Sequence, residues 1–254
     1  MYVAILGPLR VGAGNTSAIL GAKKIRATLA MLALRAGQVV SFDELIDELW
    51  GETPLKNARN ALQANVTRMR RSLGQLGLDS GEQGVVRTVG NGYLLSMPAT
   101  SLDANRFLQQ VREGHDLVGC QPEKAAERLR GSLAMWHGPA LVDVGDGPRC
   151  RAAALRLDEQ RRLAHEDLIS AQLASGEAGA VVPELRQLHA EHPERERFSE
   201  QLMLALYRTG RQSEAIDIFH RTRRRLDEEL GLLPGRELNR LYQAILTQDA
   251  SLSL

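Results

Sequence analysis

Two similar segments in the C-terminal half of the chain, ASGEAGAVVPELRQLHAEHP and RTGRQSEAIDIFHRTRRRL, place Gly176 and Gly210 34 positions apart. A fixed period of this length is typical of a repeat that consists of two helices. One such repeat cannot bury its apolar face alone, so neighbouring repeats stack into a solenoid with a concave surface. This spacing constrains the fold more than any other single feature of the chain.

An earlier segment, VGCQPEKAAERLRGSLAMW, fits the same frame with Gly119 in the position of Gly210. VDVGDGP is predicted to be a loop, and a long helix is predicted for roughly residues 151–174. The chain from Leu102 onward is therefore predicted to be almost wholly helical and tetratricopeptide-like. The predicted buried positions are Leu157, Ala164, Leu168 and Ala171 in the long helix and Ala215, Ile218, Thr222 and Leu226 in the last repeat.

The first fifty residues have a different pattern. Short apolar runs separated by turn residues predict short strands up to about residue 20. From Lys23 the apolar spacing becomes helical. Ser41 and Glu44 form a capping-box pattern, which predicts a second helix that Gly51 and Pro54 would end.

A third helix is predicted for residues 57–73, NARNALQANVTRMRRSL, which contain no acidic residue. Its apolar residues recur at helical spacing, so they form one buried stripe, made of Leu62, Val66, Met69 and Leu73. Arg59 and Asn65 are predicted to point back toward the protein. The opposite face carries Asn57, Asn60, Ala64, Thr67, Arg68 and Arg71, with Gln63 and Arg70 at its edges.

Charge is distributed unevenly along the chain. The net charge is only +1, but residues 1–100 hold 11 basic and 7 acidic side chains, against 21 and 24 in the remainder. Such an asymmetry predicts a basic binding module joined to an acidic partner module.

A β-hairpin is predicted after the basic helix, because two β-rich runs in VVRTVGNGYLLSM flank Asn91-Gly92. Two helices joined by a short turn, the second one basic, and then a hairpin follow the order of a winged helix-turn-helix. We therefore predict a mainly α fold with little β structure. Its parts are a winged-helix domain at residues 1–97, a linker at 98–101 and an all-α repeat domain at 102–254.

The exposed face of the third helix has the chemistry of a DNA-contacting surface. Arg68 can donate two hydrogen bonds to guanine, and Gln63 or Asn60 can contact adenine or phosphate. Ala64 is small enough to let the backbone approach the groove floor. Phosphate contacts, which hold the register without specifying sequence, are predicted for Lys56, Thr67, Arg70 and Arg71. The competing interpretation is a solvated basic face on an ordinary bundle helix.

The hairpin supplies further candidate contacts. Its tip, Gly90-Asn91-Gly92, is thin enough to enter a minor groove, and Arg87 and Thr88 at its base can meet phosphates. Trp50 ends the second helix, where it either packs in the core or donates its indole N–H to a phosphate.

Signals for catalysis are weak. The sequence has no GxxxxGK[ST], GxSxG or HExxH motif, and GNGYLL does not fit a dinucleotide site. His189 and His192 lie three positions apart, but without a carboxylate partner they fit solvated or capping histidines better than metal ligands. We expect no catalytic, metal or cofactor site and no cofactor. Without a signal peptide or a long apolar span, we expect a cytoplasmic, nucleoid-associated protein.

Several segments resemble a known family. LGPLRV, LRAGQVVSFDELIDELWG, ALQANVTRMRRSLG and VRTVGNGYLL are similar to the OmpR-type winged-helix domain of the Streptomyces antibiotic regulatory protein (SARP) family. LAMWHGPALVDV and the long stretch from AHEDLISAQL to NRLYQAIL resemble the bacterial transcriptional activation domain of the same family. The resemblance covers nearly the whole chain.

The resemblance implies a transcriptional activator of a secondary-metabolite gene cluster. Such activators bind direct repeats near the promoter −35 element as tandem protomers and recruit RNA polymerase holoenzyme through sigma region 4 and other subunits. By motif position, the implied DNA contacts are Asn60, Thr67, Arg68, Arg70 and Arg71, with Trp50, Arg87 and Thr88 at the backbone.

Two features of the sequence leave alternatives open. Related wings often carry a basic residue before the first tip glycine, where this chain has Val89, so Asn91 is the remaining minor-groove candidate. Arg223, Arg224 and Arg225 form either a solvated face or a polymerase contact. A second hypothesis is a helical-repeat interaction protein whose winged helix binds protein instead of DNA.

Overall fold

The computed structural model describes residues 1–14, 16–18, 20–51, 55–78 and 84–253. Pro54, which was predicted to end a helix, lies outside these ranges. The chain divides into two compact units, Met1–Arg112 with Gly131–Arg162 and Glu113–Arg130 with Leu163–Leu254. No helix among the described residues is long and apolar enough to cross a membrane.

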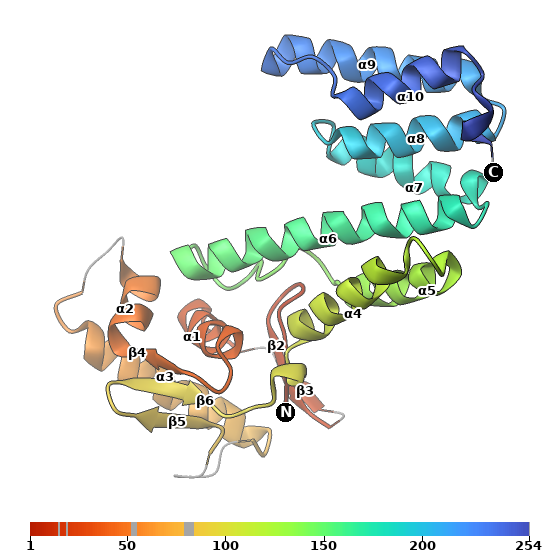
Figure 1. Cartoon of the computed structure of the whole chain (residues 1–254). Coiled ribbons are helices and arrows are strands. Elements are labelled where there is room, and N and C mark those ends of the chain that lie inside the picture. The colour runs from red at the N-terminus through yellow and green to blue at the C-terminus, as the bar shows by residue number, and fades with distance from the viewer. Residues whose placement is uncertain (15, 19, 52–54, 79–83, 254) are drawn as a thin grey trace. The chain divides into compact units, whose positions relative to one another are not determined.

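The first unit begins with a small antiparallel sheet (Figure 1). Its strands are β1 (Tyr2–Ala4), β2 (Arg10–Ala13) and β3 (Thr16–Ala18), in that order. The three strands match the short apolar runs of the sequence. Val3 pairs with Val11, and both side chains are fully buried.

Three helices follow, α1 (Lys23–Leu34), α2 (Phe42–Trp50) and α3 (Ala58–Gln75), and they pack on one another. The predicted capping box of α2 is confirmed. The Glu44 backbone N–H donates to Ser41 Oγ at 3.2 Å, and the Ser41 N–H donates to Glu44 Oε2 at 3.1 Å. The predicted buried stripe of α3 is also confirmed, because Leu62, Val66, Met69 and Leu73 are at most 1% exposed.

A second antiparallel sheet has the order β4-β6-β5, formed by β4 (Val39–Ser41), β5 (Val86–Val89) and β6 (Gly92–Leu95). β5 and β6 form the predicted hairpin, but its turn lies one residue earlier than predicted. Val89 pairs with Gly92, so the loop residues are Gly90 and Asn91, and Gly90 has a φ of 54°. A Cβ on Gly92 would lie 2.3 Å from the Val40 carbonyl oxygen, so a side chain there would clash with β4.

The rest of the chain is helical, as predicted. The helices are α4 (Asp103–Leu117), α5 (Pro122–Leu133), α6 (Pro148–Ala174), α7 (Ala178–Glu191), α8 (Glu196–Arg208), α9 (Gln212–Leu230) and α10 (Arg236–Leu246), with short 3-10 helices η2 (Ala99–Ser101) and η3 (Ala250–Leu252). α6 begins at Pro148, a few residues before the predicted start.

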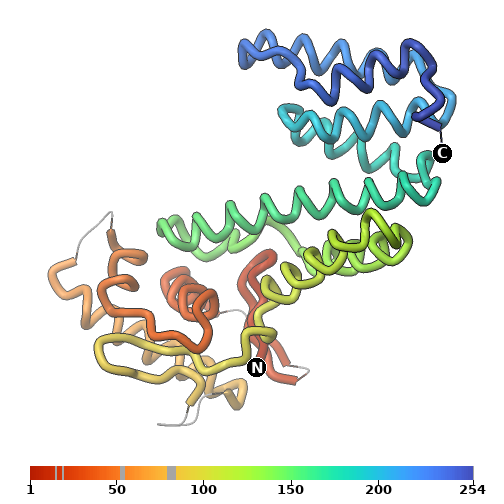
Figure 2. Tube along the Cα trace, viewed as in Figure 1, coloured from red at the N-terminus to blue at the C-terminus, as the bar shows by residue number. Residues whose placement is uncertain are grey.

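The second unit contains the two repeat segments around Gly176 and Gly210, whereas the earlier segment, residues 118–136, extends into the first unit. Figure 2 shows α7, α8, α9 and α10 joined in succession by short connections. Gly176 and Gly210 have φ values of 82° and 76°, so each ends a helix in a conformation that favours glycine. Apolar residues from α6 to α10, including Phe198 and Phe219, form one buried cluster. All eight positions predicted to be buried in the long helix and the last repeat are buried.

Hydrogen bonds between distant segments hold the first unit together. The Asp103 carboxylate accepts from the backbone N–H groups of Ile5 and Leu6 at 2.9–3.1 Å. The Glu48 carboxylate accepts from the N–H groups of Arg149 and Cys150, at 2.8 and 2.9 Å, in the first turn of α6. The first unit therefore includes residues 98–112 and 131–162 as well as the segment 1–97 that was predicted to form a winged helix.

Candidate nucleic-acid interface

The outer face of α3 is exposed and polar. Asn57, Asn60, Gln63, Ala64, Thr67, Arg68 and Arg71 are all exposed, on the side opposite the buried stripe. Asn65 is 8% exposed, as the helical wheel predicted. The structure therefore brings the predicted major-groove residues together on one face.

Arg68 and Arg71 carry the charge of this face. Within the described part of the chain, no ion pair or hydrogen bond engages either guanidinium. α3 itself contains no acidic residue. Exposed arginines without a local counter-charge leave all their donors available to an anionic partner.

Thr67 is partly engaged within its own helix. Its hydroxyl donates to the Gln63 carbonyl oxygen at 2.9 Å. The Thr67 hydroxyl oxygen can still accept a hydrogen bond. To donate to a phosphate, however, the hydroxyl would have to rotate away from the helix backbone.

Arg70 is engaged with the hairpin. Its Nε and Nη2 donate to the Val86 carbonyl oxygen at 3.1 and 2.9 Å, and Nη2 also donates to Thr88 Oγ1 at 3.1 Å. The guanidinium lies 5.8 Å from the centre of the Tyr93 ring. Arg70 and Thr88, both predicted to contact phosphates, therefore bind each other and join α3 to β5.

Arg59 joins α3 to the hairpin at a second point. Its Nη2 donates to Asn91 Oδ1 at 2.7 Å, and its guanidinium stacks 4.7 Å from the centre of the Phe42 ring. Arg59 is itself exposed, but its guanidinium is directed at the protein, as predicted. Asn91, the minor-groove candidate, keeps its side-chain NH₂ donors for another partner.

The remaining predicted residues divide into buried and exposed groups. Trp50 is only 6% exposed, and Lys24 Nζ lies 4.4 Å from the centre of its ring, which fits the core role. Burial lowers the pKa of Lys24. Lys56 and Arg87 are exposed, and no interaction of either with another described residue is present.

We expect Arg70→Met to loosen the hairpin from α3. The variant keeps an unbranched side chain of similar length but loses the hydrogen bonds to Val86 and Thr88, at a cost of about 1–2 kcal/mol. Hydrogen exchange measured by NMR should show faster exchange for the amides of β5. Arg71→Met, an exposed change on the same helix, is the matched control and should leave these rates unchanged. Equal rates in both variants would contradict a positioning role for Arg70.

The two histidines considered as metal ligands have separate partners. His189 Nδ1 lies 3.2 Å from Ser199 Oγ, and the His192 ring packs against Phe198. Burial, followed by the charges of Arg221 and Arg225, lowers the pKa of His189. Among the residues described, no group of three or more potential metal ligands lies together.

Arg223, Arg224 and Arg225 are all exposed on α9. Arg225 Nε donates to Glu229 Oε2 at 3.0 Å, one helical turn further on. Such an exposed pair within one helix contributes little to stability. The run is thus available to a partner, and both interpretations of it stand.

Comparison with known proteins agrees with this architecture. Residues 16–95 match the family described as transcriptional regulatory protein, C terminal, and residues 102–246 match the bacterial transcriptional activator domain. The two domains in this order define a transcriptional regulator with a winged-helix domain and a helical activator domain. The chain belongs to the Streptomyces antibiotic regulatory protein family.

Individual relatives are similar over nearly the whole chain. The transcriptional regulator RedD of Streptomyces coelicolor is 43% identical, over 99% of this chain and 72% of RedD. The regulatory protein DnrI of Streptomyces peucetius is 37% identical, over 98% of this chain and 93% of DnrI. The structure of Mycobacterium tuberculosis EmbR in complex with a low-affinity phosphopeptide matches with a TM-score of 0.90 and 35% identity, over 97% of this chain and 65% of that one.

Proposed function

We propose that this protein is a sequence-specific DNA-binding activator of a secondary-metabolite gene cluster. It binds direct repeats near the promoter −35 element as tandem protomers and recruits RNA polymerase holoenzyme. The observation that carries the proposal is the exposed face of α3, on which Arg68 and Arg71 lack a counter-charge among the described residues.

In this proposal the side chains divide by role. Arg68, with Asn60 and Gln63, contacts base edges, and Ala64 allows the helix to approach the groove floor. Lys56, Thr67, Arg71 and Arg87 bind phosphates and set the register. Asn91 offers its amide to the minor groove.

The other predicted contacts have a second role within the protein. Arg70 and Thr88 hold the hairpin on α3. Each can contact a phosphate only through hydrogen-bond donors that this attachment does not use. Trp50 is buried in the core, so it supports the fold of this domain. The winged helix spans residues 1–97, the linker 98–101 and the activation domain 102–254, and the activation domain contacts sigma region 4 and other polymerase subunits.

Salt dependence tests the DNA-binding part of the proposal. Phosphate contacts release counterions, so the logarithm of the binding constant should fall steeply and linearly with the logarithm of salt concentration. For a duplex with the native upstream repeats, Arg71→Gln should reduce this slope by about 1. Arg223→Gln, an exposed change on α9, is the control and should leave the slope unchanged. A shallow slope for the unmodified protein would favour the protein-binding hypothesis.

Recruitment requires a separate measurement. Run-off transcription from the same promoter with purified holoenzyme should rise when the full chain is added, and footprinting should extend from the repeats over the −35 element. Binding to the repeats without a rise in transcript would contradict the activator role and leave a DNA-binding protein of another kind.

A further inference from the structure

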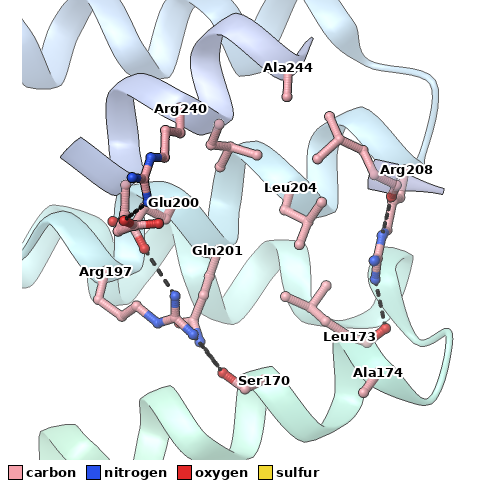
Figure 3. A pocket seen from close by; sticks show the side chains of 13 residues that line it. Ser170, Leu173, Ala174, Arg197, Glu200, Gln201, Leu204, Arg208, Arg240 and Ala244 are labelled. Atoms are coloured by element: carbon pink, nitrogen blue, oxygen red, sulfur yellow. Dashed lines mark hydrogen bonds and ion pairs between the residues drawn. The ribbon is translucent and has the colours of Figure 1, made fainter. Parts of the chain in front are cut away.

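A cavity of about 460 Å³ lies in the second unit, where α6, α8 and α10 meet (Figure 3). Cavities that bind small molecules have volumes of roughly 300–1,000 Å³. Apolar and polar side chains share the wall, and η3 adds a leucine at one end. The apolar lining consists of Leu173, Ala174, Leu204, Leu241, Ala244 and Leu252.

Charged side chains also line this cavity, and their positive and negative charges do not cancel. Arg197 Nη1 donates to Glu200 Oε2 at 3.0 Å, and Arg240 Nη1 donates to Glu237 Oε1 at 2.6 Å. Arg208 is the third arginine of the wall, and among the described residues no carboxylate lies within ion-pair distance of it. The cavity therefore carries one positive charge that the described side chains do not neutralise.

Arg208 is held in place by two backbone carbonyl groups. Its Nε donates to the Leu252 carbonyl oxygen at 2.9 Å, and Nη1 donates to the Leu173 carbonyl oxygen at 2.8 Å. Figure 3 shows these bonds at one end of the cavity, away from the Arg197–Glu200 pair. Burial lowers the pKa of Arg208, so its partly desolvated charge lacks both full hydration and a described counter-ion. A guanidinium in this state is stabilised by an incoming anion.

We propose that this cavity binds a small carboxylic acid with an apolar skeleton. The carboxylate accepts hydrogen bonds from the donors of Arg208 that the two carbonyl groups leave free. The skeleton lies against Leu173, Leu204 and Leu241. A single unneutralised cation beside a group of leucines matches one carboxylate better than a dianionic phosphate.

An NMR titration of the full chain with octanoate and with octan-1-ol tests the proposal. The two probes share an apolar chain and differ in charge. Octanoate should shift the methyl resonances of Leu204, Leu241 and Ala244 and saturate at one molecule per chain. Octan-1-ol should bind about tenfold more weakly, because it lacks the charge-assisted hydrogen bond.

Two variants separate the charge from the cavity. Arg208→Gln should weaken octanoate binding about tenfold and leave octan-1-ol binding unchanged. Ala244→Trp fills the cavity and should abolish binding of both probes. If Arg208→Gln does not fold, Ala244→Trp tests whether octanoate binds in this cavity. Arg223→Gln, outside the cavity, is the control, and circular dichroism checks the fold of every variant.

Three results would overturn the proposal. One is the absence of methyl shifts with octanoate at millimolar concentration. Another is octan-1-ol binding as tight as octanoate binding. The last is octanoate binding that either a folded Arg208→Gln variant or Ala244→Trp leaves unchanged. None of these results bears on DNA binding by α3, so the cavity proposal and the proposed function fail independently.

Discussion

Replacing Glu48 with alanine is expected to destabilise the first unit by about 2–4 kcal/mol. The Glu48 side chain is 1% exposed, and its carboxylate accepts from the N–H groups of Arg149 and Cys150. These donors belong to the first turn of α6, where no helix carbonyl can accept from them. Alanine leaves both donors without their partner and opens a cavity beside α2.

Urea unfolding followed by tryptophan fluorescence measures this effect, because Trp50 and Trp136 both lie in the first unit. Asp47→Ala is the matched control. It removes a neighbouring carboxylate that is 58% exposed and pairs with Arg149 Nη1 at 2.7 Å. Such a surface pair contributes at most about 1 kcal/mol. Equal losses in the two variants would show that capping by Glu48 does not stabilise this unit.

Replacing Arg68 with alanine is expected to cost about 1–3 kcal/mol of DNA-binding free energy and to relax base preference at one position of each repeat. The guanidinium is exposed on the predicted groove-facing side of α3, and no described residue engages it. Its removal should therefore leave the fold intact and affect only the bound state.

Gel shifts at fixed salt, on the native repeat and on duplexes with each base pair changed in turn, measure both effects. Arg71→Ala is the comparison. As a phosphate contact, Arg71 should contribute equally to all duplexes, so its loss weakens binding without changing the order of preference. If Arg68→Ala preserves both the affinity and the preference, Arg68 does not contact a base.

Local patterns in the sequence were sufficient for much of the fold. Ser41 and Glu44 lie three residues apart, so the sequence alone contains both halves of the capping box. The stripe Leu62, Val66, Met69 and Leu73 needs only helical spacing to be recognised. The same wheel predicted correctly that Asn65 is buried and that Arg59 points toward the protein.

Features that depend on distant partners could not be predicted in this way. β4 has three residues, and its partner β6 lies some fifty positions further along the chain. α6 begins before the predicted Arg151 because Pro148 is well suited to a first helical position and Glu48 accepts from the N–H groups that follow. Nothing near Glu48 in the sequence indicates that contact.

The same limitation applies within the candidate interface. The sequence predicted a phosphate contact for both Arg70 and Arg71. Only the folded chain shows that Arg70 is bound to Val86 and Thr88. Nothing in the sequence around Arg70 indicates this contact, because it depends on the packing of α3 against the hairpin.

The attachment of the hairpin to α3 by Arg59 and Arg70 has a consequence for how regulators of this kind diversify. The side chains that fasten the hairpin are different from those that face outward at positions 64, 68 and 71. In the proposed DNA complex, operator preference would therefore change by substitution at the outward positions while the scaffold keeps its shape. If these positions contact the operator as proposed, a library randomised at all three, with Arg59 and Arg70 unchanged, should yield regulators that respond to new promoters.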